Sequence, residues 1–209
     1  MNETAPHPPL PAIVPATPRQ AGALAELIDT AFAHLALHHW LVPQAAAHRQ
    51  VFPSWFRHHL DAALDHGTVH TTTDQSAVAV WLPGPTPESP GHSTLPAPCR
   101  PFAPRFHHFE NVTRPAHFGM DKPHQELALL AVSPRRQGHG LGSALLHHHH
   151  AALDRAALPA YLVAPSGPAR ALYLRNGYQD CGNPVRLHAG CEPLHPMWRI
   201  PDTSSPRRH

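Results

Sequence analysis

The stretch that could do chemistry most directly is a glycine run that follows an apolar segment. Residues 126–132 read ELALLAV, and Gly138, Gly140 and Gly142 alternate shortly afterwards, ahead of a segment with helical character. Glycine lets a backbone approach a ligand closely, and the first N–H groups of a helix have no partner within the helix. The helix dipole adds partial positive charge at the same end, so this arrangement is suited to binding phosphate groups.

Two familiar phosphate-binding loops fit this run poorly. The P-loop requires a Lys and a Ser or Thr after its last glycine, and no lysine follows here. The dinucleotide fingerprint GxGxxG would place its third glycine at Ser143, and the apolar strand lies in mid-chain instead of opening a βαβ unit.

A third family fits the run well. VSPRRQGHGLGSALL, at residues 132–146, resembles the acyl-CoA signature V-x-P-x-x-[QR]-G-x-G-x-G-x-x-L-L of the GNAT N-acetyltransferases. ARALYLRNGY, at residues 169–178, resembles the family's later element A-x-x-L-Y-x-x-x-G-F, and IVPATP at residues 13–18 is similar to its first strand and helix entry. Within the family, residues 79–81, 140–144 and 159–162 resemble puromycin N-acetyltransferase and related actinobacterial small-molecule acetyltransferases.

The resemblance implies acetyl-CoA as co-substrate. The CoA pyrophosphate is expected on backbone amides of the glycine loop, and the pantetheine arm is expected to pair with the apolar strand like an extra strand. A backbone N–H of that strand could polarise the thioester oxygen. The residues expected to bind the cofactor are Leu130, Ala131, Val132, Gln137, Gly138, His139, Gly140, Leu141, Gly142, Ser143 and Ser166.

Two catalytic side chains follow from the resemblance. Tyr173 matches the tyrosine that protonates the departing CoA thiolate, a role that suits a phenol with an ordinary pKa near 10. Glu126 stands six residues before Val132, at the offset of the catalytic glutamate in the histone-acetyltransferase branch, and a carboxylate in an apolar strand is costly unless it faces a cleft. His124 is the alternative base. Val163 replaces a glutamate found in many relatives, which puts more weight on Glu126.

The wall around the amine substrate is expected to carry aromatic and imidazole side chains. Such side chains suit a flat or heteroaromatic amine, although core packing explains several of them equally well. The expected contributors are Phe32, His38, His39, Trp40, residues 106–109, Phe118 and residues 188–195.

The four consecutive histidines at 147–150 are more conspicuous than the glycine run but less informative. Consecutive helical positions point about 100° apart, so four in a row cannot ligate one ion. The chain has 22 His and 27 Pro but one lysine, a bias that explains most of the histidines without any function. We expect no metal site.

Composition limits the other classes of function. A chain of 209 residues that is 42% hydrophobic suits one folded domain, and a net charge of +2 gives no reason to expect nucleic acid or an anionic membrane as a partner. Cys99, Cys181 and Cys191 form no CxxC pair, which is typical of reduced thiols. With prolines where a signal peptide needs an apolar run, these features predict a cytoplasmic protein, monomeric or homodimeric.

The elements that must position these residues predict an α/β GNAT fold, with a mixed central sheet flanked by helices. Residues 11–200 are expected to form one acyl-CoA N-acyltransferase domain, between a disordered arm at 1–10 and a flexible tail at 201–209. The expected strands are 12–14, 68–73, 76–82, 126–132, 160–164, 178–188 and 195–200. The expected helices begin at Thr17, at Gln44 (to Asp65, interrupted or restarted at Pro53), at Arg105 (to His117), after the glycine run (to Ala157) and at Pro168 (to Arg175).

The leading hypothesis is acetyl-CoA-dependent N-acetylation of a small molecule's amine, of antibiotic or secondary-metabolite type, by direct transfer in a ternary complex. A protein or peptide acetyltransferase is the rival enzyme, but it would favour an acidic groove and the chain has only 14 Asp and Glu. A catalytically idle acyl-CoA-binding module is the alternative outside enzymology.

Overall fold

One mixed sheet organises the protein. The computed structural model describes residues 9–84, 94–113, 122–188 and 190–203. Within them, seven strands pair in the order β1-β2-β3-β4-β5-β7-β6, and β4 with β5 is the parallel pair. The strands are β1 (Ile13–Pro15), β2 (Thr68–Thr72), β3 (Ala77–Pro83), β4 (Gln125–Val132), β5 (Ala160–Ala164), β6 (Gln179–Asp180) and β7 (His195–Arg199). The predicted fold class, a mixed sheet flanked by helices, is confirmed.

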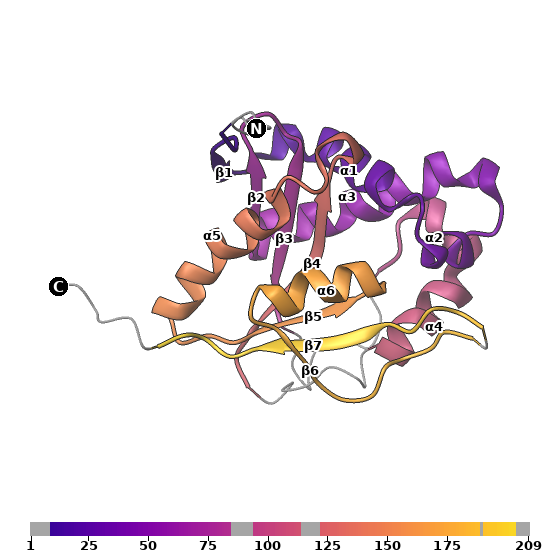
Figure 1. Cartoon of the computed structure of the whole chain (residues 1–209). Coiled ribbons are helices and arrows are strands. Elements are labelled where there is room, and N and C mark those ends of the chain that lie inside the picture. The colour runs from indigo at the N-terminus through magenta and orange to yellow at the C-terminus, as the bar shows by residue number, and fades with distance from the viewer. Residues whose placement is uncertain (1–8, 85–93, 114–121, 189, 204–209) are drawn as a thin grey trace, which may run out of the picture.

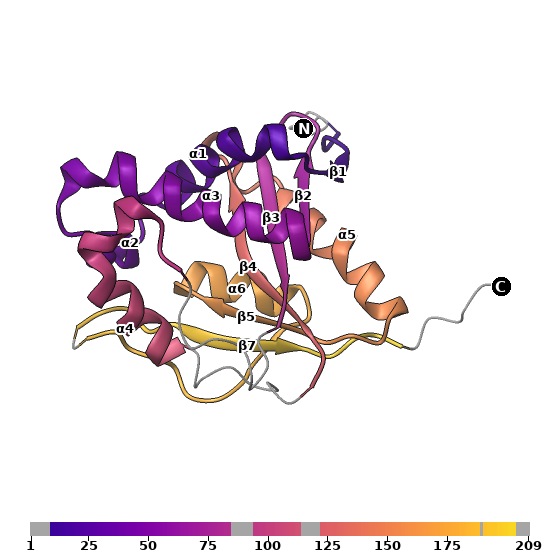
Figure 2. The same ribbon diagram turned by 180° about the vertical axis from the view of Figure 1, so that it is seen from behind.

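Helices cover both faces of this sheet (Figures 1 and 2). On one face lie α1 and α3, and on the other lie α5 and α6, while α2 and α4 lie together beyond one end of the sheet. The helices are α1 (Ala21–Phe32), α2 (Ala36–Leu41), α3 (His48–His66), α4 (Ala103–Thr113), α5 (Leu141–Arg155) and α6 (Gly167–Arg175), with short 3₁₀ turns at Pro18–Gln20, Ala45–Ala47, Ala97–Phe102 and Pro134–Arg136. No helix in these ranges is long and apolar enough to cross a membrane.

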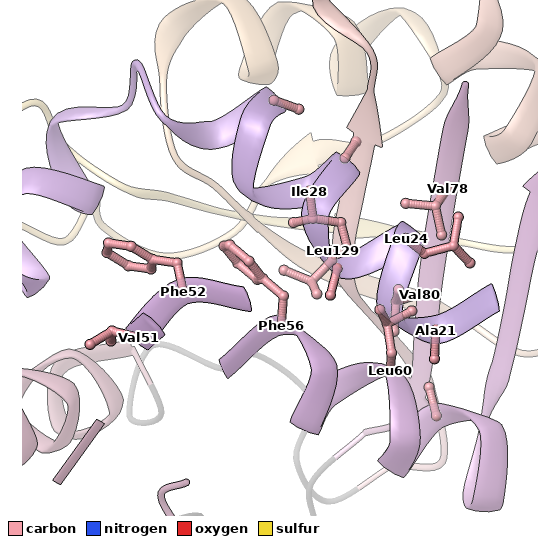
Figure 3. Packing of buried hydrophobic residues seen from close by; sticks show 14 of the residues in the cluster. Ala21, Leu24, Ile28, Val51, Phe52, Phe56, Leu60, Val78, Val80 and Leu129 are labelled. Carbon is pink, nitrogen blue, oxygen red and sulfur yellow. The ribbon is translucent and has the colours of Figure 1, made fainter. Parts of the chain in front are cut away.

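Each face has its own apolar core. Between the sheet and helices α1 and α3, the cluster includes Leu24, Ile28, Phe56 and Leu129, all of which are almost inaccessible to water. Figure 3 shows these side chains converging from α1, α3 and β4. The opposite core joins Trp81 to α5 and α6. The central strands are therefore covered on both sides, as their continuous apolar sequences predict.

Three predicted elements differ from the structure. A separate helix, α2, precedes the predicted helix at 44–65. Pro43 follows α2, and a proline disfavours helical geometry in the residue before it, so α2 ends there. The helix α3 runs through Pro53 without a break, because the aromatic residues beside this proline are held in the core. The predicted strand 178–188 reduces to β6 and one bridge, Val185 with Leu194.

A bulge in β4 decides which face its first residues occupy. Val80 pairs with Leu129 whereas Trp81 pairs with Leu127, so Ala128 is an extra residue opposite the partner strand. A bulge of this kind reverses the alternation of side chains beyond it. Glu126 consequently pairs with Leu82 and lies on the α1 and α3 face, although simple alternation from Val132 would place it on the α5 face.

The parallel strands β4 and β5 separate soon after they meet. Their pairing covers only Gln125 with Ala160 and Glu126 with Tyr161. From Leu127 onward, the β5 side of β4 has no strand partner in the described part of the chain, which leaves backbone donors and acceptors open to a ligand.

Candidate functional site

A cavity of about 850 Å³ lies where the two strands separate. It runs from the glycine loop along β4 to the ends of α1, α2 and α4. Its lining includes Glu126 to Val132, Arg136, Gln137, Gly138, Gly140 to Ser143, Tyr161, Val163, Ser166, Leu172, Tyr173, Arg175, Phe32, His34, His38, Trp55, Phe56, His59, Phe109, Glu110 and Thr113.

The glycine loop presents open backbone to this cavity. Gly138 and Gly140 have positive φ values of 78° and 84°, a conformation that costs residues with a side chain about 1–2 kcal/mol. A Cβ atom at either position would meet nothing within 4 Å, so the space beside the backbone is free. Gly140 begins α5 without a side-chain cap, and the Gln137 amide donates a hydrogen bond to the Val132 carbonyl at 3.1 Å. These features fit a bound pyrophosphate.

Two arginines add positive charge to the same end. Arg136 directly precedes the loop and lines the cavity. Arg175 also lines it, and its neighbour Asn176 donates a hydrogen bond to the Ser143 hydroxyl in the first turn of α5 at 3.1 Å. The end of α6 is thereby tied to the beginning of α5, and both arginines stand where an anionic cofactor would lie.

Two of the expected cofactor contacts have roles of their own in the structure. Ser166 lines the cavity, and its hydroxyl accepts the N–H of Ala169 at 3.3 Å as the N-cap of α6. His139 lies outside the cavity lining, and its Nδ1 contacts the Gln137 carbonyl at 2.8 Å. The remaining expected cofactor residues, from Leu130 to Ser143, line the cavity.

Tyr173 reaches the cavity from α6. The residue is 7% exposed and packs edge-to-face on Tyr178, with ring centroids 5.7 Å apart. Burial raises the pKa of its phenol above the ordinary value, so the hydroxyl keeps its proton at neutral pH. No hydrogen bond from a described residue occupies this hydroxyl, which is therefore free to act on a ligand.

Glu126 faces the same cavity from β4, as a result of the bulge. Burial raises the pKa of its carboxyl to about 7, and no described residue pairs with it. Its register partner on β5 is Tyr161, whose pKa is raised by burial and by the nearby Glu126 carboxylate. A carboxyl group with a pKa near 7 can accept a proton from an ammonium group at neutral pH.

His124, the alternative base, lies apart from the cavity. Its ring is buried beside Gly84 and stands 5.2 Å from the Trp198 ring, and its Nδ1 contacts the Lys122 carbonyl at 2.7 Å. It is not among the residues that line the cavity. The geometry therefore brings Glu126, and not His124, to the site.

Only some of the residues expected in the substrate wall line the cavity. Phe32 and His38 line the cavity, whereas His39 and Trp40 do not. Trp40 instead stacks on His188 at 6.2 Å and receives the Arg105 guanidinium at 5.4 Å from its ring centre. Consecutive residues of a helix cannot all face one side, so His38 turns inward and its two neighbours turn away. Phe118 lies outside the described residues.

Sequence reasoning missed several contributors to the wall, among them four from α3 and α4. Trp55, Phe56 and His59 line it from α3, and Glu110 lines it from α4. Their spacing at 55, 56 and 59 matches one face of a helix, but that pattern is equally typical of a buried core. Nothing in the sequence indicates that α3 and α4 meet at the site.

Of the histidines at 147–150, two are buried in the core and two are exposed on the surface. His149 stacks on Trp81 at 4.2 Å, and Nε2 of His150 lies 3.1 Å from the Tyr178 hydroxyl, while His147 and His148 are exposed. Within the described ranges, no group of three or more His, Cys, Asp or Glu side chains is placed to hold a metal ion.

Comparison with known proteins agrees with this geometry. Residues 108–180 match the family model of the acetyltransferase (GNAT) domain. A similar solved structure is the "histone acetyltransferase HPA2 and related acetyltransferase" of Corynebacterium glutamicum, with 23% identity, 95% of this chain and 99% of that chain covered, and a TM-score of 0.66.

Two further structures share the fold. Arylalkylamine N-acetyltransferase 2 of Aedes aegypti has 15% identity, covers 91% of this chain and 99% of its own, and has a TM-score of 0.64. The NatC complex bound to Gag peptide and CoA has 14% identity, 90% and 97% coverage, and a TM-score of 0.55. This chain therefore shares the fold of these acetyltransferase structures, and its residues 108–180 are similar to the acetyltransferase (GNAT) domain, a similarity that supports an acetyl-CoA-dependent acyltransferase.

Proposed function

We propose that this protein transfers the acetyl group of acetyl-CoA to the amine of a small molecule, by direct transfer in a ternary complex. The proposal rests on how charged groups are distributed along one continuous cavity. Arg136, Arg175 and the glycine loop stand at one end, and the unpaired Glu126 carboxyl stands beyond them. An anionic cofactor and a cationic amine can therefore meet over the open edge of β4.

The residues divide the reaction between them. Glu126 takes a proton from the ammonium group, because only the neutral amine has a lone pair with which to attack the thioester carbon. Backbone N–H groups of β4 near Leu130 to Val132 stabilise the negative charge that develops on the carbonyl oxygen. The C–N bond forms, the C–S bond breaks, and Tyr173 gives its proton to the departing thiolate, so the products are an amide and CoA.

A small molecule fits the acceptor side better than a polypeptide. The acceptor end of the cavity is walled by α1, α2, α3 and α4 and lined mainly by aromatic, aliphatic and imidazole side chains. Such a wall suits a compact amine with an apolar body, of the kind found among antibiotics and secondary metabolites. We place the activity in one domain at residues 11–200 of a cytoplasmic monomer or homodimer.

A thiol-release assay tests the proposal. Acetyl-CoA is supplied with panels of nucleoside antibiotics, aryl amines, arylalkylamines, polyamines, amino acids and peptides, and the free thiol of CoA is measured. We expect turnover with a subset of the small amines, and with none of the peptides. Turnover with peptides alone would favour the rival protein acetyltransferase, and CoA binding without any turnover would favour an idle binding module.

The Tyr173→Phe variant tests the role of the phenol in the same assay. Loss of the acid should lower kcat by about 10²–10⁴-fold, because the thiolate must leave unprotonated. The affinity for acetyl-CoA, measured by calorimetry, should remain close to that of the parent. The matched control is Tyr178→Phe, which removes the neighbouring buried hydroxyl on the α5 side, and unchanged turnover in Tyr173→Phe would contradict the assignment.

A further inference from the structure

Two glutamates and two arginines line the cavity, counted among the residues that the structure describes. Arg136 and Arg175 belong to the cofactor end, and Glu126 is the proposed base. The fourth is Glu110 on α4, for which neither the fold nor the acetyl transfer itself provides a role. A second carboxylate therefore lies at the acceptor end.

The Glu110 side chain lines the cavity and is partly buried, whereas a glutamate on the protein surface is usually exposed. Its Oε2 atom is inaccessible to water and has no hydrogen-bond partner in the described structure. A buried carboxylate oxygen without a donor loses its hydration with no compensation, which is unfavourable unless a ligand supplies the donor. The cavity is the side from which such a donor can arrive.

Among the described residues, no side chain donates a hydrogen bond to Oε2 of Glu110. Thr113 lies one turn away, but its hydroxyl donates to the backbone carbonyl of Phe109 at 2.8 Å. Arg105, the arginine of the same helix, donates to the Trp40 carbonyl and covers the Trp40 ring. The cation that α4 itself provides is therefore engaged elsewhere.

Aromatic rings flank the carboxylate along the cavity wall. Phe109 precedes it on α4 and stands 6.5 Å from the Trp55 ring, which in turn lies 5.4 Å from Phe56. His59 completes this group, with burial lowering the pKa of its imidazole so that it is uncharged at neutral pH. A cation entering here meets aromatic faces and one carboxylate, a combination that favours ammonium groups.

We propose that Glu110 binds a second ammonium group of the acceptor, so that the preferred substrate is an apolar or aromatic diamine. One amine is acetylated over Glu126 while the other is held by Glu110. The proposal rests on the acetyl-transfer function and narrows its substrate class. It makes Glu110 a specificity-determining residue that contacts the second amino group of the substrate and not the reacting atoms.

A matched pair of amines tests this assignment. 1,4-Bis(aminomethyl)benzene and 4-methylbenzylamine differ only in the second amino group. We expect kcat/KM to favour the diamine by about tenfold or more, the value of a hydrogen bond to a charged group. In Glu110→Gln the ratio of the two kcat/KM values should fall to about one, mainly through KM for the diamine, and Glu110→Asp should restore part of the ratio because it keeps the charge.

The control is Glu26→Gln, which removes the same charge from an exposed position on α1 outside the cavity. It should leave the ratio unchanged. Equal kcat/KM for both amines in the parent protein, or an equal loss for both amines in Glu110→Gln, would overturn the role of Glu110. Thermal unfolding of each variant shows whether the fold is kept.

A binding experiment separates this proposal from the function on which it rests. Calorimetry with the CoA-loaded protein measures diamine affinity without any acetyl transfer. Weaker diamine binding in Glu110→Gln than in Glu26→Gln supports the assignment, and equal binding overturns it. Absence of acetylation with every amine would contradict the proposed function alone, because the calorimetric result would still decide what Glu110 binds.

Discussion

Glu126 shows how far a residue's surroundings change its chemistry. In water a glutamate is a weak base at neutral pH, but burial on the cavity side of β4 raises its pKa to about 7. The bulge at Ala128 is what aims it into the cavity, and the unpaired carboxyl contrasts with Gln125, whose side chain lies on the α5 face at 3.1 Å from Nε2 of His149.

The pH dependence of catalysis follows from this pKa. A base works only when deprotonated, so kcat/KM for an alkylamine should rise with pH through an acidic limb near pH 7. Glu126→Gln should remove that limb and lower kcat by about 10²–10⁴-fold. With an aryl amine that is already neutral at pH 7 the loss should be much smaller, since no ammonium proton must be removed.

The control for this variant is again Glu26→Gln, which should keep the pH profile of the parent. An acidic limb that persists unchanged in Glu126→Gln, measured with the same alkylamine, would assign the proton transfer to another group. Equal losses with the alkyl and the aryl amine would show that Glu126 supports the structure and not the proton transfer.

At the scale of elements, the cofactor end depends on how α5 begins. The backbone turns through left-handed conformations at Gly138 and Gly140, and the first turn of α5 then points its N–H groups toward the cavity. The helix α6 is held against this turn by Asn176, which donates to Ser143 and to the Leu172 carbonyl. The features of the loop that suit a bound pyrophosphate are therefore those of its backbone and not of its side chains.

Gly140→Ala should weaken cofactor binding through backbone strain alone. A Cβ atom at Gly140 meets no neighbour within 4 Å, so the penalty is the left-handed φ of 84°, about 1 kcal/mol. We expect that stability loss together with a several-fold rise in the Kd for CoA, measured by calorimetry, because relaxation of the loop misaligns the N–H groups.

Gly182→Ala is the matched control, because Gly182 has a φ of 74° and equally open space but lies outside the cavity lining. It should lower stability to a similar degree and leave the Kd for CoA unchanged. Equal CoA affinities in the two variants would show that the Gly140 backbone does not position the binding groups.

At the scale of the whole molecule, buried histidines link stability to pH. Burial lowers the pKa of His38 to about 3, of His149 to about 4 and of His150 to about 3, against an ordinary value of 6.5. His38 stacks on Phe52 in the core beside α3, and the other two are buried residues of α5 that face the opposite core. Both cores thus contain imidazoles that stay neutral in the folded state.

Acid should therefore destabilise the protein well above the range in which carboxylates titrate. Below pH 6.5 the unfolded chain binds protons at these histidines, whereas the folded protein does not. Their contribution to the free energy of unfolding is therefore full above pH 6.5 and is lost as the pH falls toward 4. Each such histidine can contribute up to about 1.4 kcal/mol per pH unit in that window. Glu126, with its raised pKa, acts in the opposite direction between about pH 4.5 and 7 but is outnumbered.

Urea unfolding at pH 7, 6 and 5 measures this dependence. His149→Phe keeps a ring on Trp81 without a titrating group, and should flatten the fall in unfolding free energy by about 1 kcal/mol per pH unit. His147→Gln on the exposed face of α5 is the control and should retain the slope of the parent. A slope that does not differ between the two variants would assign the acid sensitivity elsewhere.

The sequence by itself determined the features that repeat in local patterns. The apolar run at 126–132 predicts a buried central strand, and the glycines after it predict a helix that begins at an anion-binding site. Each depends on neighbours within a few residues, so local propensity and periodicity are sufficient.

Only the tertiary structure decided which side chains meet at the acceptor end. The face of Glu126 depends on a bulge that has no sequence signature, since an alanine between leucines fits either register. Trp55 and Glu110 are 55 positions apart and meet because α3 and α4 pack at the same end of the sheet. Long-range packing sets such juxtapositions, which is why the sequence indicated the cofactor while the structure was needed to show which side chains line the other end of the cavity.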